Sequence, residues 1–149
     1  MIVKNLIFLI EYFIIQFELS YYLFPSNTLI YIHDALKPHC YKPDASIFEK
    51  EPIEIEFTNP KDEKTYKANL DPKVVMEVLS DDLKVKLGNY KKIDSLQQII
   101  FIEQNKMGVY VHERMGNNWL ESKYFEENES VFILDCAVLL KKLYRNVKF

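Results

Sequence analysis

The densest pattern of apolar positions lies near the beginning of the chain, in the segment IVKNLIFLIEYFIIQFELSYYLF. Apolar side chains recur there at helical spacing, which predicts a helix over residues 3–19 that packs against a sheet. The positions expected in the core are Leu6, Leu9, Ile10, Phe13, Ile14 and Phe17. Glu11 and Gln16 interrupt the apolar run, so the pattern favours a core helix over an integral membrane segment or a signal peptide. A membrane-associated protein is the alternative interpretation of this segment.

A second apolar run, over residues 74–79, is short, rich in β-branched residues and interrupted only by Glu77. Its length, and the proline at position 72 before it, predict a buried central strand. A carboxylate inside such a strand costs on the order of several kcal/mol unless a cation, a metal or hydrogen bonds compensate it. Glu77 is therefore the first candidate for a functional residue.

The remaining segments combine strand patterns with turn residues. Asp81 or Asp82 can cap a short helix that follows the central strand. A hairpin is predicted over residues 51–70, and a second one joins SLQQIIFIEQ to GVYVHERM. The other predicted elements are strands at residues 28–33, 41–48 and 117–125, and a short strand followed by a terminal helix at residues 137–144. No repeat or low-complexity linker divides the chain, so we expect a single domain over residues 1–149.

Composition narrows the classes of function. The chain has 149 residues, of which 48% are hydrophobic and 28% charged, as in a globular domain. Its three glycines form no glycine-rich phosphate-binding loop. The net charge of −3 counts mildly against nucleic-acid binding. Two cysteines, Cys40 and Cys136, do not make a disulfide scaffold, so a reduced, cytoplasmic location is expected.

Three residues stand out as a chemical set. Asp44 follows Pro43 at a predicted strand, Glu77 lies in the central strand, and Lys86 lies on the next helix. Two carboxylates can hold Mg²⁺, and a cation beside them can stabilise the negative charge on a phosphate. The structural alternative is that Glu77 pairs with Lys86 or Lys73 and that backbone donors satisfy Asp44. A separate zinc site is a further alternative, formed by His33, His39 and Cys40.

The order of these short motifs resembles one protein family. Pro43-Asp44, then EVLS from Glu77, then Lys86 with Tyr90, then SLQ from Ser95, is similar to the Uma-type restriction endonucleases. That family belongs to the PD-(D/E)xK nuclease superfamily. The resemblance extends backward to IVKNLIFLI and forward through VYVHERMGNNW to LYRNVKF, which is nearly the whole chain. It implies an α/β (α+β) fold with a restriction-endonuclease-like mixed β-sheet flanked by helices.

The resemblance also implies a function: a Mg²⁺- or Mn²⁺-dependent DNA endonuclease that hydrolyses phosphodiester bonds. Asp44 and Glu77 would be the metal ligands, with the Val78 carbonyl near them. Lys86 would be the catalytic cation, because Leu79 stands where the superfamily often has its lysine.

Several departures from the family pattern weaken this expectation of activity. Asp81 follows Ser80 directly, where the family continues with P-S-T, and Gln98 replaces a glutamate. The family's N-terminal hairpin and helix do not precede Met1, which suggests a truncated chain. The alternative is therefore a catalytically inactive remnant of the fold that acts as an interaction protein. In the family, the N-terminal hairpin and helix cover the helix expected at residues 3–19. Their loss would leave one apolar flank of that helix exposed, which favours a homodimer.

Overall fold

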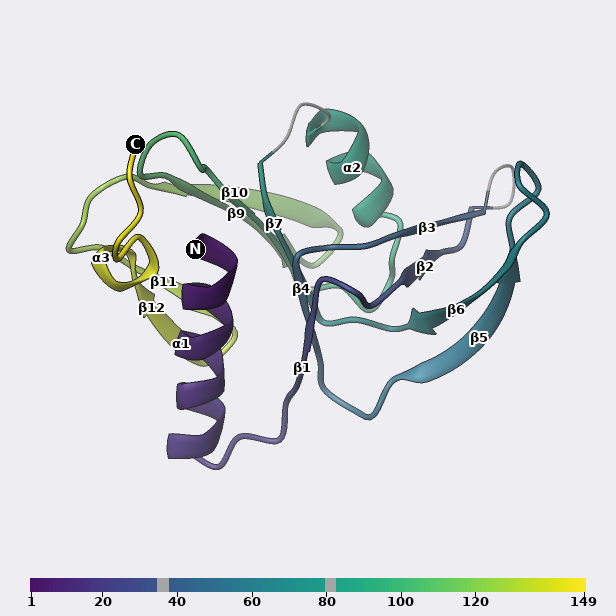
Figure 1. Ribbon diagram of the computed structural model, residues 1–149, viewed down its shortest axis with the longest axis horizontal. Coiled ribbons are helices and arrows are strands. Elements are labelled where there is room, and N and C mark those ends of the chain that lie inside the picture. The colour runs from purple at the N-terminus through teal and green to yellow at the C-terminus, as the bar shows by residue number, and fades with distance from the viewer. Residues whose placement is uncertain (35–37, 80–82) are drawn as a thin grey trace.

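The structure is a computed structural model that describes residues 1–34, 38–79 and 83–149. The expectations for Ser80, Asp81 and Asp82, including the helix cap, lie outside the described residues. Three helices and two larger sheets make up the described chain, together with one two-stranded sheet (Figure 1).

The central six-stranded sheet has the order β1-β4-β7-β8-β9-β10. Its strands are β1 (Tyr22–Pro25), β4 (Ala45–Phe48), β7 (Val74–Val78), β8 (Gln98–Ile102), β9 (Val109–Met115) and β10 (Asn118–Tyr124). β7 and β8 are parallel and the other neighbours are antiparallel, so the sheet is mixed. The buried central strand expected around Glu77 is confirmed as β7, whose first four residues are all buried. β1 falls in a segment for which the sequence predicted no strand.

A second, four-stranded sheet has the order β3-β2-β6-β5. Its strands are β2 (Ile30–Ile32), β3 (His39–Tyr41), β5 (Ile53–Thr58) and β6 (Thr65–Leu70). The single strand predicted over residues 41–48 is wrong, because β3 lies in this sheet and β4 in the central one (Figure 1). Pro43 lies at the break, where it cannot donate a ladder hydrogen bond. The break leaves Asp44 at the junction of the two sheets.

Helix α1 (Ile2–Gln16) packs against β12 (Cys136–Leu139) and α3 (Leu140–Leu143). Its core residues are Ile2, Leu6 and Ile10, with Leu9, Phe13 and Ile14 partly buried beside them. Phe17 is 60% exposed, contrary to prediction, because the helix ends at Gln16. The opposite flank of the helix exposes Phe8, Tyr12 and Ile15. No helix in the described parts of the chain is long and apolar enough to cross a membrane.

The C-terminal segment differs from its prediction. The helix expected from Ala137 begins only at Leu140, and Ala137 lies instead in β12, paired with β11 (Ser130–Ile133). Leu134 adopts a left-handed φ of 52° between the two strands, which lets the chain turn back on itself. Val138 is then buried against α1, so packing of a β-branched residue outweighs the helical pattern.

Candidate functional site

Strand pairing brings the two predicted acids together. β4 and β7 run antiparallel with Ala45 opposite Met76, so Asp44 lies beside the strand end that carries Glu77. A carboxylate oxygen of Asp44, Oδ2, accepts a hydrogen bond from the backbone N–H of Val78 at 2.7 Å. This bond fixes the orientation of the Asp44 side chain relative to β7.

Helix α2 (Leu83–Tyr90) brings the lysine to the same place. Lys86 Nζ lies 2.9 Å from Glu77 Oε1, so the predicted approach of Lys86 to the acid pair is confirmed. Helical side chains lean toward the helix N-terminus, which for α2 follows the end of β7 in the chain. The catalytic and metal-binding roles assigned to Asp44, Glu77 and Lys86 stay predictions.

Glu77 is the most heavily buried member of the set. Its side chain is 8% exposed, and its second oxygen, Oε2, is buried without a hydrogen-bond partner among the described residues. Burial raises the pKa of Glu77, the neighbouring Lys86 opposes this rise, and the negative charge of Asp44 adds to it. The Glu77 carboxylate therefore has one cationic partner, at Oε1, and a second oxygen with no hydrogen bond of ordinary geometry in the described chain.

Two tyrosines surround this ion pair. Tyr90 is fully buried, and its pKa is raised by that burial and by the charge of Glu77 nearby. The Tyr90 hydroxyl has no hydrogen bond of ordinary geometry within the described chain. It lies near Glu77, and this proximity lowers the pKa of that acid. The Tyr41 ring stacks edge-on against Tyr90 at 5.2 Å and lies 5.9 Å from Lys86 Nζ. Sequence reasoning singled out Tyr90 but missed Tyr41, whose only signal is its position three residues before Asp44.

The acid pair opens onto a cavity of about 620 Å³, here called the acid cleft. The N-terminal residues of α1 form part of its wall. Its polar and main-chain lining comes from Lys42, Asp44, Glu77, Val78, Lys86 and Gln104. Two lysines balance two carboxylates, so the cleft is less acidic than the acid pair alone.

The donor set suits a hard divalent cation. Mg²⁺ is commonly held by one or two carboxylates and keeps several waters, so Asp44 together with the unpartnered oxygen of Glu77 fits it. No group of three or more histidine, cysteine or acidic side chains is placed to hold a metal in the described ranges, and His33, His39 and Cys40 form none. The oxygen donors at the acid cleft favour Mg²⁺ or Mn²⁺ over zinc.

Comparison with known proteins adds evidence about the fold. No protein-family model matches the chain, and no curated protein sequence matches it either. Among solved structures, it is similar to a crystal structure from Anabaena variabilis described as a "putative nuclease belonging to DUF820". The TM-score is 0.68 at 15% identity, and the match covers 97% of this chain and 78% of the other.

The fold is restriction-endonuclease-like. This confirms the fold class that the sequence predicted. DUF820 is the Uma-type family, whose motif order the chain resembles. At 15% identity the match shows the architecture of the chain and not its chemistry.

Proposed function

We propose that this protein is a metal-dependent nuclease that hydrolyses phosphodiester bonds in DNA, with Mg²⁺ or Mn²⁺ held by Asp44 and Glu77. The observation that carries the proposal is the unpartnered buried oxygen of Glu77 beside a second carboxylate and a lysine. Asp44, Glu77 and Lys86 all line the acid cleft, on a restriction-endonuclease-like fold. A purely structural ion pair needs neither the second acid nor the cavity.

Each residue of the chain has a distinct task in the proposed reaction. When bound, the cation would supply Lewis-acid polarisation of the phosphate and a water of lowered pKa. Lys86, held at Glu77, presents an ammonium group that can donate to a phosphate oxygen as negative charge develops there. The Val78 N–H holds Asp44 in place before substrate binds, which reduces the reorganisation needed.

A specific observation also supports a second candidate, a catalytically inactive remnant that acts as an interaction protein. Asp44 and Glu77 both have partners inside the chain, the Val78 N–H and Lys86. These contacts can stabilise the fold with no metal at all. The two candidates differ in whether the acid cleft binds a cation and cleaves DNA.

Nicking of supercoiled plasmid in the presence of Mg²⁺ tests the proposed function. The wild-type chain should nick the plasmid, and EDTA, Asp44→Asn and Glu77→Gln should each abolish nicking. Glu54→Gln is the matched control, because Glu54 is an exposed strand glutamate that also pairs with a lysine, Lys67, at 3.7 Å. Wild-type protein that cleaves neither the plasmid nor single-stranded circular DNA, or cleavage that survives both acid-cleft substitutions, would contradict the proposal.

A further inference from the structure

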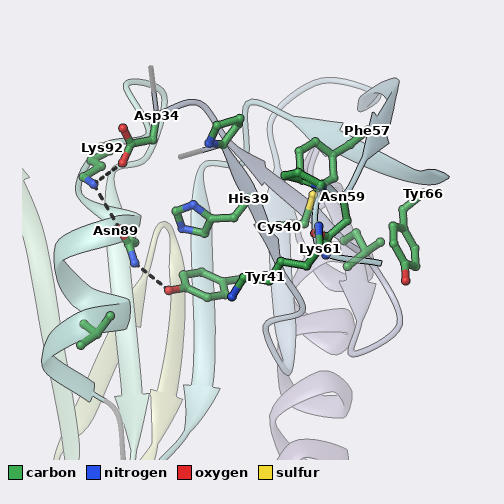
Figure 2. A pocket seen from close by; sticks show the side chains of 14 residues that line it. Asp34, His39, Cys40, Tyr41, Phe57, Asn59, Lys61, Tyr66, Asn89 and Lys92 are labelled. Carbon is green, nitrogen blue, oxygen red and sulfur yellow. Dashed lines mark hydrogen bonds and ion pairs between the residues drawn. The ribbon is translucent and has the colours of Figure 1, made fainter. Parts of the chain in front are cut away.

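A second cavity, of about 600 Å³, lies on the four-stranded sheet between α2 and the β5–β6 hairpin. We call it the second cleft, and Figure 2 shows it from close by. Its main lining side chains are Tyr41, Phe57, Lys61, Tyr66, Asn89 and Lys92. A concave space of this size is typical of a small-molecule or nucleotide site.

One wall of the second cleft is a connected set of polar groups. Lys92 donates to Asp34 at 2.7 Å and to the Asn89 side-chain oxygen at 3.2 Å. The Asn89 amide nitrogen in turn donates to the Tyr41 hydroxyl at 2.7 Å (Figure 2). These bonds hold the Tyr41 ring in one orientation at the cavity, so its surface is preorganised for a ligand.

The other wall is aromatic. Phe57 and Tyr66 are directly opposite each other across the β5–β6 pair, and both line the cleft (Figure 2). The Tyr66 hydroxyl donates to Asp62 at 2.7 Å, which fixes the ring from its outer end. Burial keeps the Cys40 thiol neutral by raising its pKa to about 11, so this residue adds to the apolar lining. Rings on this wall and Tyr41 on the other suit a flat, aromatic ligand.

The charge at the second cleft is opposite in sign to that of the whole chain. Its lining includes Lys61 and Lys92 against one acid, Asp34, whereas the chain carries a net charge of −3. Lys61 is exposed, so its ammonium group is accessible to a ligand at the surface. A flat ring system that carries negative charge fits this lining, and a nucleotide has both properties.

The second cleft shares its structural elements with the acid cleft. β3 ends in the second cleft at Tyr41, and the chain continues directly into Lys42 and Asp44 of the acid cleft. On α2, Asn89 faces the second cleft while Lys86 faces the acid cleft. Lys86 Nζ of the acid cleft lies 5.9 Å from the ring of Tyr41 in the second cleft, so the two clefts are near neighbours in the fold.

We propose that the second cleft binds an unpaired nucleobase of single-stranded DNA, next to the phosphate that occupies the acid cleft. This inference rests on the proposed nuclease function and adds the substrate class to it. Bases in a duplex are stacked inside the helix and cannot enter a cavity of this kind, whereas an unstacked base presents both faces to aromatic side chains. The clustered rings make the site tolerant of base identity.

Fluorescence anisotropy with a short, labelled single-stranded oligonucleotide in EDTA measures binding without cleavage. Tyr66→Ala should weaken binding about tenfold, while Tyr66→Phe, which keeps the ring, should bind like wild type. Lys61→Ala should weaken binding less and should reduce its dependence on salt. The matched controls are Tyr12→Ala, which removes an exposed tyrosine of α1, and Lys67→Ala, which removes a β6 lysine outside the cleft lining. Circular dichroism establishes that each variant is folded.

Three results would overturn the inference: no binding of single strands by the wild type, equal binding by Tyr66→Ala, or equally strong binding of the matching duplex. Cleavage of single-stranded circular DNA with Mg²⁺ by the same proteins tests the nuclease function separately, because this substrate contains unpaired bases throughout. If the wild type nicks DNA and Tyr66→Ala still binds single strands normally, the base site is wrong and the nuclease stands. If Tyr66→Ala loses binding and the wild type does not cleave single-stranded circular DNA, the base site stands and the nuclease assignment fails.

Discussion

The two clefts are built on sheets with opposite environments. The acid cleft lies at the ends of β4 and β7, where nearly every side chain is buried. The second cleft lies beside the β5–β6 hairpin, whose outer residues are exposed; Ile53, for example, is 61% exposed. A lysine–glutamate ion pair should therefore affect the free energy of unfolding more at the buried acid cleft than on the exposed β5–β6 hairpin.

This difference shows where stability and function are coupled. Glu77 and Lys86 hold each other inside the protein, so a change in either affects folding as well as chemistry. Tyr66 and Lys61 lie on a hairpin at the surface, so a change there should affect ligand binding with little effect on folding.

The largest expected effect is on stability at the acid cleft. Lys86→Met leaves the Glu77 carboxylate, 8% exposed, without its cation, and should lower the free energy of unfolding by about 2–3 kcal/mol at neutral pH. Urea unfolding measures the change. The control is Lys67→Met, which removes a lysine from the exposed Glu54 pair and should leave stability unchanged.

Adding Glu77→Gln to Lys86→Met should restore most of this loss, because no charge then remains buried without a partner. A loss of equal size in Lys86→Met and Lys67→Met would contradict the contrast between the two sheets. A double variant that is no more stable than Lys86→Met would show that packing of the lysine stem, and not charge, causes the loss.

The exposed flank of α1 should mediate a homodimer. Phe8 is 67% exposed and Ile15 is 75% exposed on one side of the helix. Phe8→Lys should raise the dimer dissociation constant by roughly tenfold or more, because burial of one large apolar side chain contributes about 1.5–3 kcal/mol. Analytical ultracentrifugation measures this, with Tyr22→Lys on β1 as control. A wild-type monomer at all concentrations would contradict the expectation.

Stability should depend on pH through Glu77. Burial keeps its folded-state pKa above its unfolded-state value, so the native protein retains a proton that the unfolded chain has already released. Between these two pKa values the free energy of unfolding should fall as pH rises, and the penalty is fully present above the folded-state pKa. Urea unfolding from acidic to neutral pH should show this slope in the wild type relative to Glu77→Gln. A difference between the two proteins that is constant with pH would contradict it.

The smallest expected effect is at the tip of the β5–β6 hairpin. Glu63 adopts a left-handed φ of 57°, which asparagine tolerates better than other side chains. Glu63→Asn should raise the free energy of unfolding by about 0.5 kcal/mol and leave single-strand binding unchanged. Thermal unfolding measures the gain, and Glu63→Ala, which lacks this preference, should show none. A change in binding would mean that the hairpin tip contributes to the second cleft.

The sequence predicted the approach of Lys86 to Glu77, because both residues lie in segments with clear local patterns. Glu77 interrupts an apolar run, and Lys86 lies one helix later, so strand and helix geometry alone bring them together. The break between β3 and β4 was missed, although Pro43 was an available signal for it. The apolar pattern in the C-terminal segment favoured a helix at Ala137, and hairpin pairing with β11 outweighed it.

The second cleft was not predictable from the sequence. Tyr41, Phe57, Tyr66 and Asn89 come from four separate elements, and each is an ordinary strand or helix residue in its own segment. The pairing of β5 with β6, of that hairpin with β2, and of β2 with β3 brings the strand residues around one cavity. Long-range pairing of this kind leaves no short motif in the chain.

The central claim is that Asp44 and Glu77 together hold a divalent cation, and titration calorimetry with Mn²⁺ tests it most directly. The wild type should bind one Mn²⁺, and Mg²⁺ should compete for the same site. Asp44→Asn and Glu77→Gln should each abolish the heat of binding, whereas Glu54→Gln and His39→Ala should bind like wild type. Unchanged Mn²⁺ affinity in both Asp44→Asn and Glu77→Gln would contradict the claim.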